Sequence, residues 1–297
     1  MSKEIKGFSK LTKKEKIEWL SKSCFKGSDS AKKILTQYWN IDSNLQKLHD
    51  EFSENTISNY YLPFAIAPNF LINNKIYAVP MTIEESSVVA AASKAAKFWM
   101  HHGGFKSEVI KTEKIGQVHF IFNGEKKIIK EYFDFVKPYL FENTKEITKN
   151  MQSRGGGINE IQLIDKSTEL DGYYQIFATF NTVDAMGANF INSCLEEFAQ
   201  TFCNSIKKFD DKKLNKKDIN IIMSILSNFV PNCIVKSSVS CRVSELNNLE
   251  PESKDFAEKF VKAIKIANID MHRAVTHNKG VMNGIDAVAI ATGNDFR

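Results

Sequence analysis

The chain has 297 residues, of which 43% are hydrophobic and 25% charged, a composition that excludes a disordered or fibrous protein. At roughly 100–200 residues per domain, the length predicts two domains. Forty basic and 35 acidic residues give a net charge of +5, which is too evenly balanced to indicate nucleic-acid binding but suits a small anionic ligand.

Membrane insertion and secretion are not expected. No apolar run reaches the roughly 18 residues of a membrane span, and residues 1–20 lack the apolar core of a signal peptide. We therefore expect a soluble, cytoplasmic protein. The cysteines are scattered, without a C-x-x-C pair, so buried thiols are expected rather than disulfides or a metal site: Cys24, Cys194, Cys203, Cys233 and Cys241.

Helices and short extended segments are predicted for the first hundred residues. Thr12 and Glu15 have the spacing of a capping box that starts a helix. The elements expected after it are a helix at 31–52, loop and extended chain at 60–72 where two prolines occur, a strand at 76–81, and a helix rich in small residues from Val88 that ends at Gly103-Gly104.

The pattern changes near residue 110, where strands and helices begin to alternate. The segments predicted as strands are 115–122, 158–164, 173–181 and the extended run 233–243, and those predicted as helices are 125–150, 188–207 and 218–229. This β-α-β-β-α-(α)-β order, interrupted by a lysine- and aspartate-rich linker at 207–218, is the split βαβ or ferredoxin-like signature. A helix at 253–268 and a final apolar strand at 287–292 complete the prediction.

The first segment that could carry chemistry is PMTIEESSVVAAAS. Glu84 and Glu85 precede a helix of small residues that would let a ligand or another backbone approach closely. The simpler interpretation is a pair of surface carboxylates that complement the helix dipole.

The second segment is NTVDAMGANFIN, which joins a predicted strand to a predicted helix. Asp184, Gly187 and Asn189 lie in this turn, where free backbone N–H groups could face a phosphate. The alternative is a plain helix cap at Asp184 with a packing glycine. Neither G-x-G-x-x-G nor G-x-x-x-x-G-K-[ST] occurs in the chain, so neither standard phosphate loop supports nucleotide binding.

The third segment, RAVTHNKGVMNGIDAVAIATGND, gathers polar side chains among glycines and small apolar residues: Arg273, His277, Asn278, Lys279, Asn283 and Asp295. A buried lysine near a carboxylate such as Asp295 could stabilise a developing oxyanion. The alternative is a structural buried ion pair. No histidine spacing in the chain supports a metal site.

In this order, the three segments resemble the bacterial class II type of 3-hydroxy-3-methylglutaryl-coenzyme A (HMG-CoA) reductase. The resemblance covers essentially the whole chain and rests on residues 54–93, on DAMGAN and on THNKGVMNGIDAVAIATGND. It implies an α+β fold in which a large mixed α/β substrate domain (1–109 and 220–297) carries an inserted small ferredoxin-like, dinucleotide-binding domain (110–219).

The resemblance also implies roles for the residues of the first and third segments. Glu85 would donate a proton to the reacting carbonyl oxygen, Lys279 would polarise that carbonyl, and Asp295 would bond to the lysine. The residues implied for binding the hydroxymethylglutaryl group, or for lying beside the lysine, are Ser87, Arg273 and Asn283.

The implied cofactor is NADH or NADPH. Six residues of the turn would face it, Asp184, Ala185, Met186, Gly187, Ala188 and Asn189, with Asn228 near the nicotinamide. Glu160, which follows three glycines, matches an acidic position that bonds the adenine ribose in some members. A carboxylate there accepts from a ribose 2′-hydroxyl and repels a 2′-phosphate, which favours NADH.

The activity implied is reduction of HMG-CoA to mevalonate and free coenzyme A, in a homodimer or higher homo-oligomer without nucleic-acid or membrane partners. Two departures from the family pattern stand out. Ser58 replaces the last glycine of E-N-V-I-G, and the chain stops at Arg297, before the segment that carries the family's catalytic histidine.

Two alternatives remain. The first is a catalytically incomplete homologue that binds a coenzyme A ester or a dinucleotide, or that acts only with a partner chain. The second is an RNA-binding module, because its strand and helix order is the same, although the aromatic RNP1 pattern is missing.

Overall fold

The computed structural model describes residues 4–209, 214–248 and 253–296 and divides into two compact units. Unit 1 comprises Met1–Pro68, Ala78–Ala95 and Phe260–Arg297, and unit 2 comprises Asn69–Tyr77 and Ala96–Lys259. Residues 210–213 of the predicted linker lie outside the described residues.

Three short helices begin unit 1: α1 (Lys13–Cys24), α2 (Asp29–Gln37) and α3 (Ser43–Glu51). The capping box is confirmed, since Thr12 Oγ1 accepts from the Glu15 N–H at 3.3 Å and the Thr12 N–H donates to Glu15 Oε2 at 2.7 Å. The helical stretch predicted at 31–52 is divided into α2 and α3, because the Asp42 side chain caps α3 as a new helix by accepting from the backbone N–H groups of residues 44 and 45.

A two-stranded sheet follows, formed by β1 (Phe64–Ile72) and β2 (Lys75–Thr82). Asn73 and Asn74 join them with φ of 49° and 66°, the pair of positive angles that a type I′ hairpin turn requires. Pro68 is tolerated because both strands of a two-stranded sheet are edge strands. The predicted small-residue helix is α4 (Ser86–Met100), and Gly103 after it has φ +88°.

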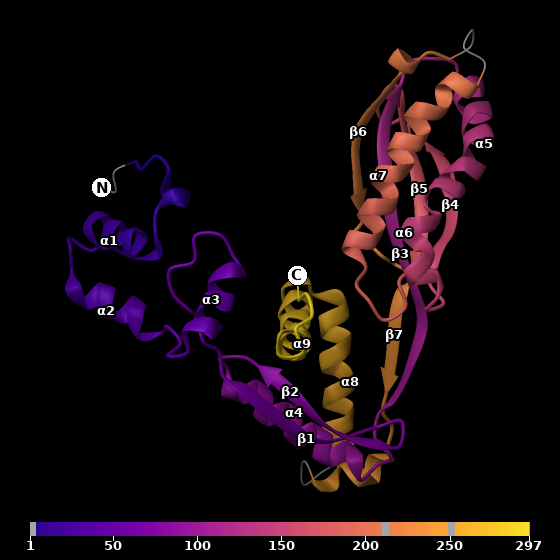
Figure 1. Ribbon diagram of the computed structural model, residues 1–297. Helices are drawn as coiled ribbons and strands as arrows, with labels where there is room; N and C mark the ends of the chain where they lie inside the picture. Colours follow the sequence, from indigo (N-terminus) through magenta and orange to yellow (C-terminus); the bar gives the residue numbers. More distant parts are fainter. Residues whose placement is uncertain (1–3, 210–213, 249–252, 297) are drawn as a thin grey trace. The chain divides into compact units, whose positions relative to one another are not determined.

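Unit 2 contains the predicted split βαβ arrangement (Figure 1). Its strands pair antiparallel in the order β4-β5-β3-β6, and β7 pairs with the first half of the long strand β3. The elements in chain order are β3 (Lys106–Phe122), α5 (Lys126–Asn143), α6 (Lys145–Gln152), β4 (Gly157–Asp165), β5 (Tyr173–Asn181), α7 (Ala188–Asn204), β6 (Ile219–Leu226) and β7 (Cys233–Ser238). The α+β fold class is therefore confirmed.

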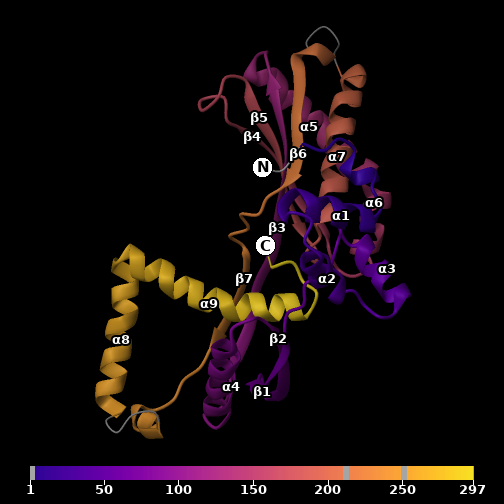
Figure 2. The ribbon, with the colours of Figure 1, turned by 90° about the vertical axis from the view of Figure 1, so that its left-hand side faces the viewer.

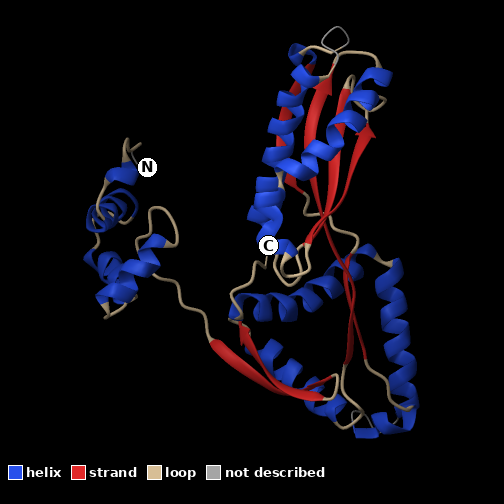
Figure 3. Cartoon of the chain, turned by 45° about the vertical axis from the view of Figure 1, so that its right-hand side comes forward, coloured by secondary structure: helices blue, strands red, loops and turns tan. Residues whose placement is uncertain are grey.

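The core of unit 2 lies between this sheet and its helices, which cover one face of it (Figures 2 and 3). Alternate residues of β3 and β5 point into the core, as the two-residue period of a strand requires, and Phe120 and Phe180 are fully buried. From the helices, Tyr132 of α5 and Phe202 of α7 belong to the same core cluster. The Phe202 ring centroid lies 5.0 Å from that of Phe120 and 5.0 Å from that of Tyr132. Each such side chain contributes roughly 1.5–3 kcal/mol of burial free energy.

Two predicted elements are of the wrong type. Residues 219–226, predicted as helix, form edge strand β6, and residues 287–292, predicted as strand, belong largely to helix α9 (Met271–Ala291), which follows α8 (Ser253–Ile269). Short apolar runs fit a buried helix or a strand equally well. Pairing with β3 makes the first run a strand, and the second run continues the helix that Asp270 caps. The helical stretch at 125–150 is also divided, since α5 ends and α6 begins around Thr144.

The five cysteines all lie in the described part of the chain and form no disulfide there, and they differ in exposure. Burial in the core raises the pKa of the Cys194 thiol to about 12, whereas Cys24 is exposed. We expect iodoacetamide at pH 8 to alkylate Cys24 in the native protein and Cys194 only after unfolding, as peptide mass spectrometry would record. Because the folded pKa of Cys194 is raised, its contribution to stability is complete at low pH and falls as the pH rises toward 12. Native-state alkylation of Cys194 as fast as that of Cys24 would contradict this.

Among the described residues, no helix combines the length and the apolar character needed to cross a membrane. The same described ranges contain no group of three metal-ligating side chains placed to hold an ion.

Candidate functional site

The first predicted segment places two of its side chains in direct contact in unit 1. Glu85 directly precedes α4, and its Oε1 accepts from Ser87 Oγ at 2.8 Å. Both side chains are exposed. The hydroxyl therefore fixes a carboxylate that remains accessible to a ligand.

The third segment is a single long helix, α9. Asp270 caps it by accepting from the Arg273 N–H at 2.9 Å. One turn separates Lys279 from Asn283, and in the amide orientation that satisfies both of its polar atoms, Asn283 accepts from Lys279 Nζ at 3.0 Å and donates to the Lys279 carbonyl oxygen at 3.2 Å. Lys279 itself is exposed, so the expectation of a buried lysine is wrong within this chain.

Lys279 lies near the middle of α9, and Asp295 lies four residues past its C-terminal end. The Asn294 N–H donates to the Ala289 carbonyl oxygen at 2.8 Å, which places Asp295 near the last turn of the helix. Ten residues of helix separate Lys279 from Ala289, a rise of about 15 Å. The helix therefore holds the two predicted catalytic groups apart within one chain.

In unit 2, the DAMGAN segment forms a tight turn between β5 and α7. Thr182 is fully buried, its hydroxyl donates to the Ala185 carbonyl oxygen at 2.6 Å, and the Ala185 N–H donates to the Thr182 carbonyl oxygen at 3.0 Å. Val183 has φ +56°, which is rare for a β-branched residue, and its N–H donates to Asn181 Oδ1 at 2.9 Å.

The N-cap of α7 is Gly187, with φ +81° and no side chain that accepts from the first-turn N–H groups. The alternative in which Asp184 caps the helix is therefore wrong. A Cβ on Gly187 would lie 2.4 Å from Thr182 Cγ2, so only glycine fits. An α-helix that begins with uncapped N–H groups behind a glycine is a suitable site for the pyrophosphate of a dinucleotide.

Two further predicted segments reach the same end of the sheet as this turn. Gly157, which opens β4, pairs with Asn181 at the end of β5, so Glu160 lies near that end of β4. On the other side, the Leu226 N–H donates to Asn192 Oδ1 of α7 at 3.0 Å, two residues before Asn228. Glu160 and Asn228 are exposed. The structure thus gathers the predicted cofactor residues around one end of the sheet in unit 2.

Comparison with known proteins identifies the family. The family model described as hydroxymethylglutaryl-coenzyme A reductase matches residues 12–297. The chain belongs to the HMG-CoA reductase family. It is 31% identical over 297 residues to the 3-hydroxy-3-methylglutaryl-coenzyme A reductase of Archaeoglobus fulgidus, and 30% identical over 256 residues to a probable reductase of Borreliella burgdorferi.

The similarity to HMG-CoA reductases extends to solved structures. The enzyme of Streptococcus pneumoniae matches with a TM-score of 0.72 and 31% identity over 98% of this chain and 74% of that one. A structure of the class II enzyme from the same organism, bound to NADPH in open conformations, matches with the same TM-score and 30% identity. The alignments cover 100% and 84% of this chain, but only 63% and 55% of the length of the Archaeoglobus and Borreliella relatives.

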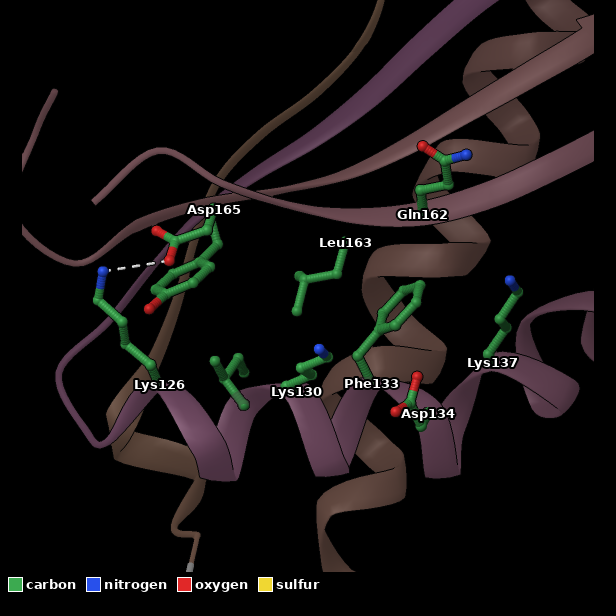
Figure 4. A pocket seen from close by; sticks show the side chains of 10 residues that line it. Lys126, Lys130, Phe133, Asp134, Lys137, Gln162, Leu163 and Asp165 are labelled. Atoms are coloured by element: carbon green, nitrogen blue, oxygen red, sulfur yellow. Dashed lines mark ion pairs between the residues drawn. The ribbon is translucent and has the colours of Figure 1, made fainter. Parts of the chain in front are cut away.

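A separate cavity of about 500 Å³ lies between α5 and β4 in unit 2 (Figure 4). Lys126 at one end of it pairs with Asp165 at 3.2 Å, and Ser167 and Lys126 hold the pKa of the Asp165 carboxyl below its usual value. The other residues that line the cavity come from α5 and from strands β4 and β5, and they include Lys130, Phe133, Asp134, Lys137, Gln162, Leu163 and Tyr174. The lining contains no residue predicted for the HMG-CoA reductase site.

Sequence reasoning missed the residues that shape the DAMGAN turn from outside it. Asn181 and Thr182 precede the motif, and Asn192 follows it. Each of the three makes a hydrogen bond from its side chain to a backbone group. No sequence pattern predicts these hydrogen bonds. An asparagine and a threonine before a helix suggest an ordinary cap, and only the observed bonds reveal their contacts.

Proposed function

We propose that this chain contributes the substrate-binding and dinucleotide-binding parts of an HMG-CoA reductase, which converts HMG-CoA to mevalonate and coenzyme A. The observation that carries the proposal is the uncapped N-terminus of α7 behind Gly187, within a DAMGAN segment of a chain that belongs to this family. In this proposal, residues 1–109 and 220–297 serve the substrate, apart from Asn228, and residues 110–219 together with Asn228 serve the dinucleotide.

The roles proposed for the polar side chains follow from the charge that the reaction develops. When bound, the dinucleotide supplies the hydride for each of two reductions. Negative charge grows on one substrate oxygen in each step, and the Lys279 ammonium, oriented by Asn283, would stabilise it. Glu85, positioned by the Ser87 hydroxyl, would donate the proton to that oxygen.

The remaining proposed roles concern charge and binding. Asp295 would set the charge and position of a lysine ammonium, and the Arg273 guanidinium would bind the free carboxylate of the hydroxymethylglutaryl group. Ser87 would contact the same carboxylate. An arginine suits this task because its planar fork of donors matches a carboxylate.

Glu160 is proposed to set the preference for NADH over NADPH. Its exposed carboxylate near the DAMGAN end of β4 could accept from a ribose 2′-hydroxyl and would repel a 2′-phosphate. Glu160→Gln is therefore expected to lower the ratio of kcat/KM for NADH over NADPH by about tenfold, the effect of roughly 1.4 kcal/mol. Glu169→Gln, which changes a carboxylate beyond the opposite end of β4, is the control. An unchanged ratio in Glu160→Gln would remove Glu160 from cofactor selection.

A homodimer or higher homo-oligomer is proposed for the working enzyme. The separation of Lys279 from Asp295 along α9 suggests that a complete site takes these groups from two copies. The exposed apolar side chains of α8 and α9 supply a surface for such an assembly, with Ile269 85% and Met271 74% exposed.

The test is a reductase assay on the purified chain with HMG-CoA and either NADH or NADPH. We expect two dinucleotides to be oxidised, followed by absorbance, for each coenzyme A thiol formed, because the reduction of a thioester to an alcohol consumes two hydrides. Reactions without HMG-CoA are the control. A folded chain that binds HMG-CoA and dinucleotide but forms no thiol would contradict the proposed catalysis while leaving the binding roles intact.

A further inference from the structure

We propose that Thr182 is a positioning residue for the dinucleotide: its side chain holds the DAMGAN turn in the conformation that presents the N-terminus of α7. The inference rests on the proposed dinucleotide function, and it assigns that function a residue outside the DAMGAN motif. It acts through the backbone of the turn and not by touching the ligand.

The contacts of Thr182 connect the two ends of the turn. Its Oγ1 donates to the Ala185 carbonyl oxygen at 2.6 Å, and its own carbonyl oxygen accepts from the Ala185 N–H at 3.0 Å. Its Cγ2 occupies the space in which a Cβ of Gly187 would lie. With the side chain fully buried, Thr182 contacts both Ala185 and Gly187 from inside the turn.

The turn needs such support because its backbone is not the one its sequence prefers. Val183, between Thr182 and the motif, has φ +56°, where a β-branched side chain is strongly disfavoured. Asn181 Oδ1 accepts from the Val183 N–H at 2.9 Å, so one bond restrains the residue before the motif. The Thr182 hydroxyl supplies the second restraint, within the motif itself.

The consequence concerns the helix terminus. Gly187 provides no side-chain acceptor for the first-turn N–H groups of α7, so their direction depends on the path of the chain from Thr182 to Gly187. If that path relaxes, Val183 can leave the left-handed region and the N–H groups no longer converge on one point. A phosphate binds such groups well only when they converge.

If the Thr182 hydroxyl only stabilised the fold, its loss would lower the stability of the protein without a specific effect on the turn. Thr201 supplies the matched control, because it is also buried, at 2% exposed, and its hydroxyl donates to Glu197 Oε1 at 2.9 Å within α7. Thr182→Val and Thr201→Val each remove one buried hydroxyl from unit 2 and keep the branched shape.

The experiment measures hydrogen exchange of the backbone amides of residues 183–189, and the Kd for NADH and for NADPH by fluorescence titration of the full chain. For Thr182→Val we expect amide exchange in the turn to rise about tenfold and both Kd values to rise about tenfold, the effect of one lost hydrogen bond. Thr182→Ser keeps the hydroxyl and should restore both readouts to within about threefold. Thr201→Val should leave both readouts unchanged even if it lowers the Tm.

Three results would overturn the inference. The first is unchanged amide exchange in Thr182→Val, and the second is a change in exchange and affinity in Thr201→Val as large as in Thr182→Val. The third is a loss of affinity in Thr182→Ser as large as in Thr182→Val. If Thr182→Val does not fold, Thr182→Ala compared with Thr182→Ser isolates the hydroxyl in the same way. A wild-type chain that binds neither NADH nor NADPH would refute the proposed function and the binding role together, and the exchange data would then report on the turn alone.

Discussion

Lys279→Ala is expected to lower kcat by about 10²–10³-fold, the usual cost of removing one oxyanion-stabilising group. Lys279 is the cation proposed to face the charge that develops on the substrate oxygen, and Asn283 already orients its ammonium at 3.0 Å. Because the group acts on charge that appears mainly in the transition state, KM for HMG-CoA should change far less than kcat. The reductase assay of the proposed function measures both constants.

Two further variants make this result specific to the ammonium. Lys265→Ala removes an exposed lysine from α8 and should keep wild-type turnover. Asn283→Ala keeps Lys279 but removes its oriented partner, so a smaller loss of about tenfold is expected, the effect of one hydrogen bond. Wild-type kcat in Lys279→Ala, from an active preparation, would show that another group stabilises the oxyanion.

The ferredoxin-like part of the fold could be predicted because its elements carry strong local signals. Strand β5 (Tyr173–Asn181) has the predicted bounds, since buried and half-buried residues alternate over 176–181 and the strand lies between a turn-rich segment and the DAMGAN turn. The two elements of the wrong type have no such signal. Residues 219–226 form a strand because β3 offers an unpaired edge beside them, which is a property of the sheet and not of the segment.

The final apolar run is the opposite case, a segment predicted as a strand that forms a helix. Residues 287–291 look like a strand in isolation, but they continue a helix that the Asp270 cap begins sixteen residues earlier than the run. Gly280 and Gly284, which reduce helix propensity, lie inside α9 nonetheless. The helix that the Asp270 cap starts therefore continues through both glycines and through the final apolar run.

The local contacts of the candidate site could be predicted where they lie within one short motif, as for Lys279 beside Asn283 and for Gly187 in the turn before α7. The site was not predictable where geometry depends on the whole element. Lys279 and Asp295 are 16 residues apart in the sequence. The two side chains would lie close together if the chain between them turned back, but they lie apart because most of that chain is helix α9. No feature of the sequence distinguishes these two outcomes.

Gly187→Ala is expected to weaken dinucleotide binding by about 30-fold or more. The alanine Cβ would lie 2.4 Å from Thr182 Cγ2 and 2.8 Å from Thr182 Cβ, and Thr182 is fully buried and cannot move aside. An L-residue at φ +81° adds roughly 1–2 kcal/mol of backbone strain, and overpacking adds typically 1–3 kcal/mol. The turn can relieve both only by changing the path that leads into α7. Titration with NADH and with NADPH, alongside a urea denaturation curve, measures the effect.

Gly7→Ala separates the two causes of this loss. Gly7 has φ +75°, close to that of Gly187, but a Cβ there would meet no atom within 4 Å. It should therefore lose only the stability that the backbone strain accounts for, roughly 1–2 kcal/mol, and it should keep wild-type dinucleotide affinity. If Gly187→Ala loses no more stability than Gly7→Ala and binds NADH as the wild type does, the turn tolerates a side chain at this position. The close approach of Gly187 to Thr182 would then have no part in presenting the helix N-terminus to the cofactor.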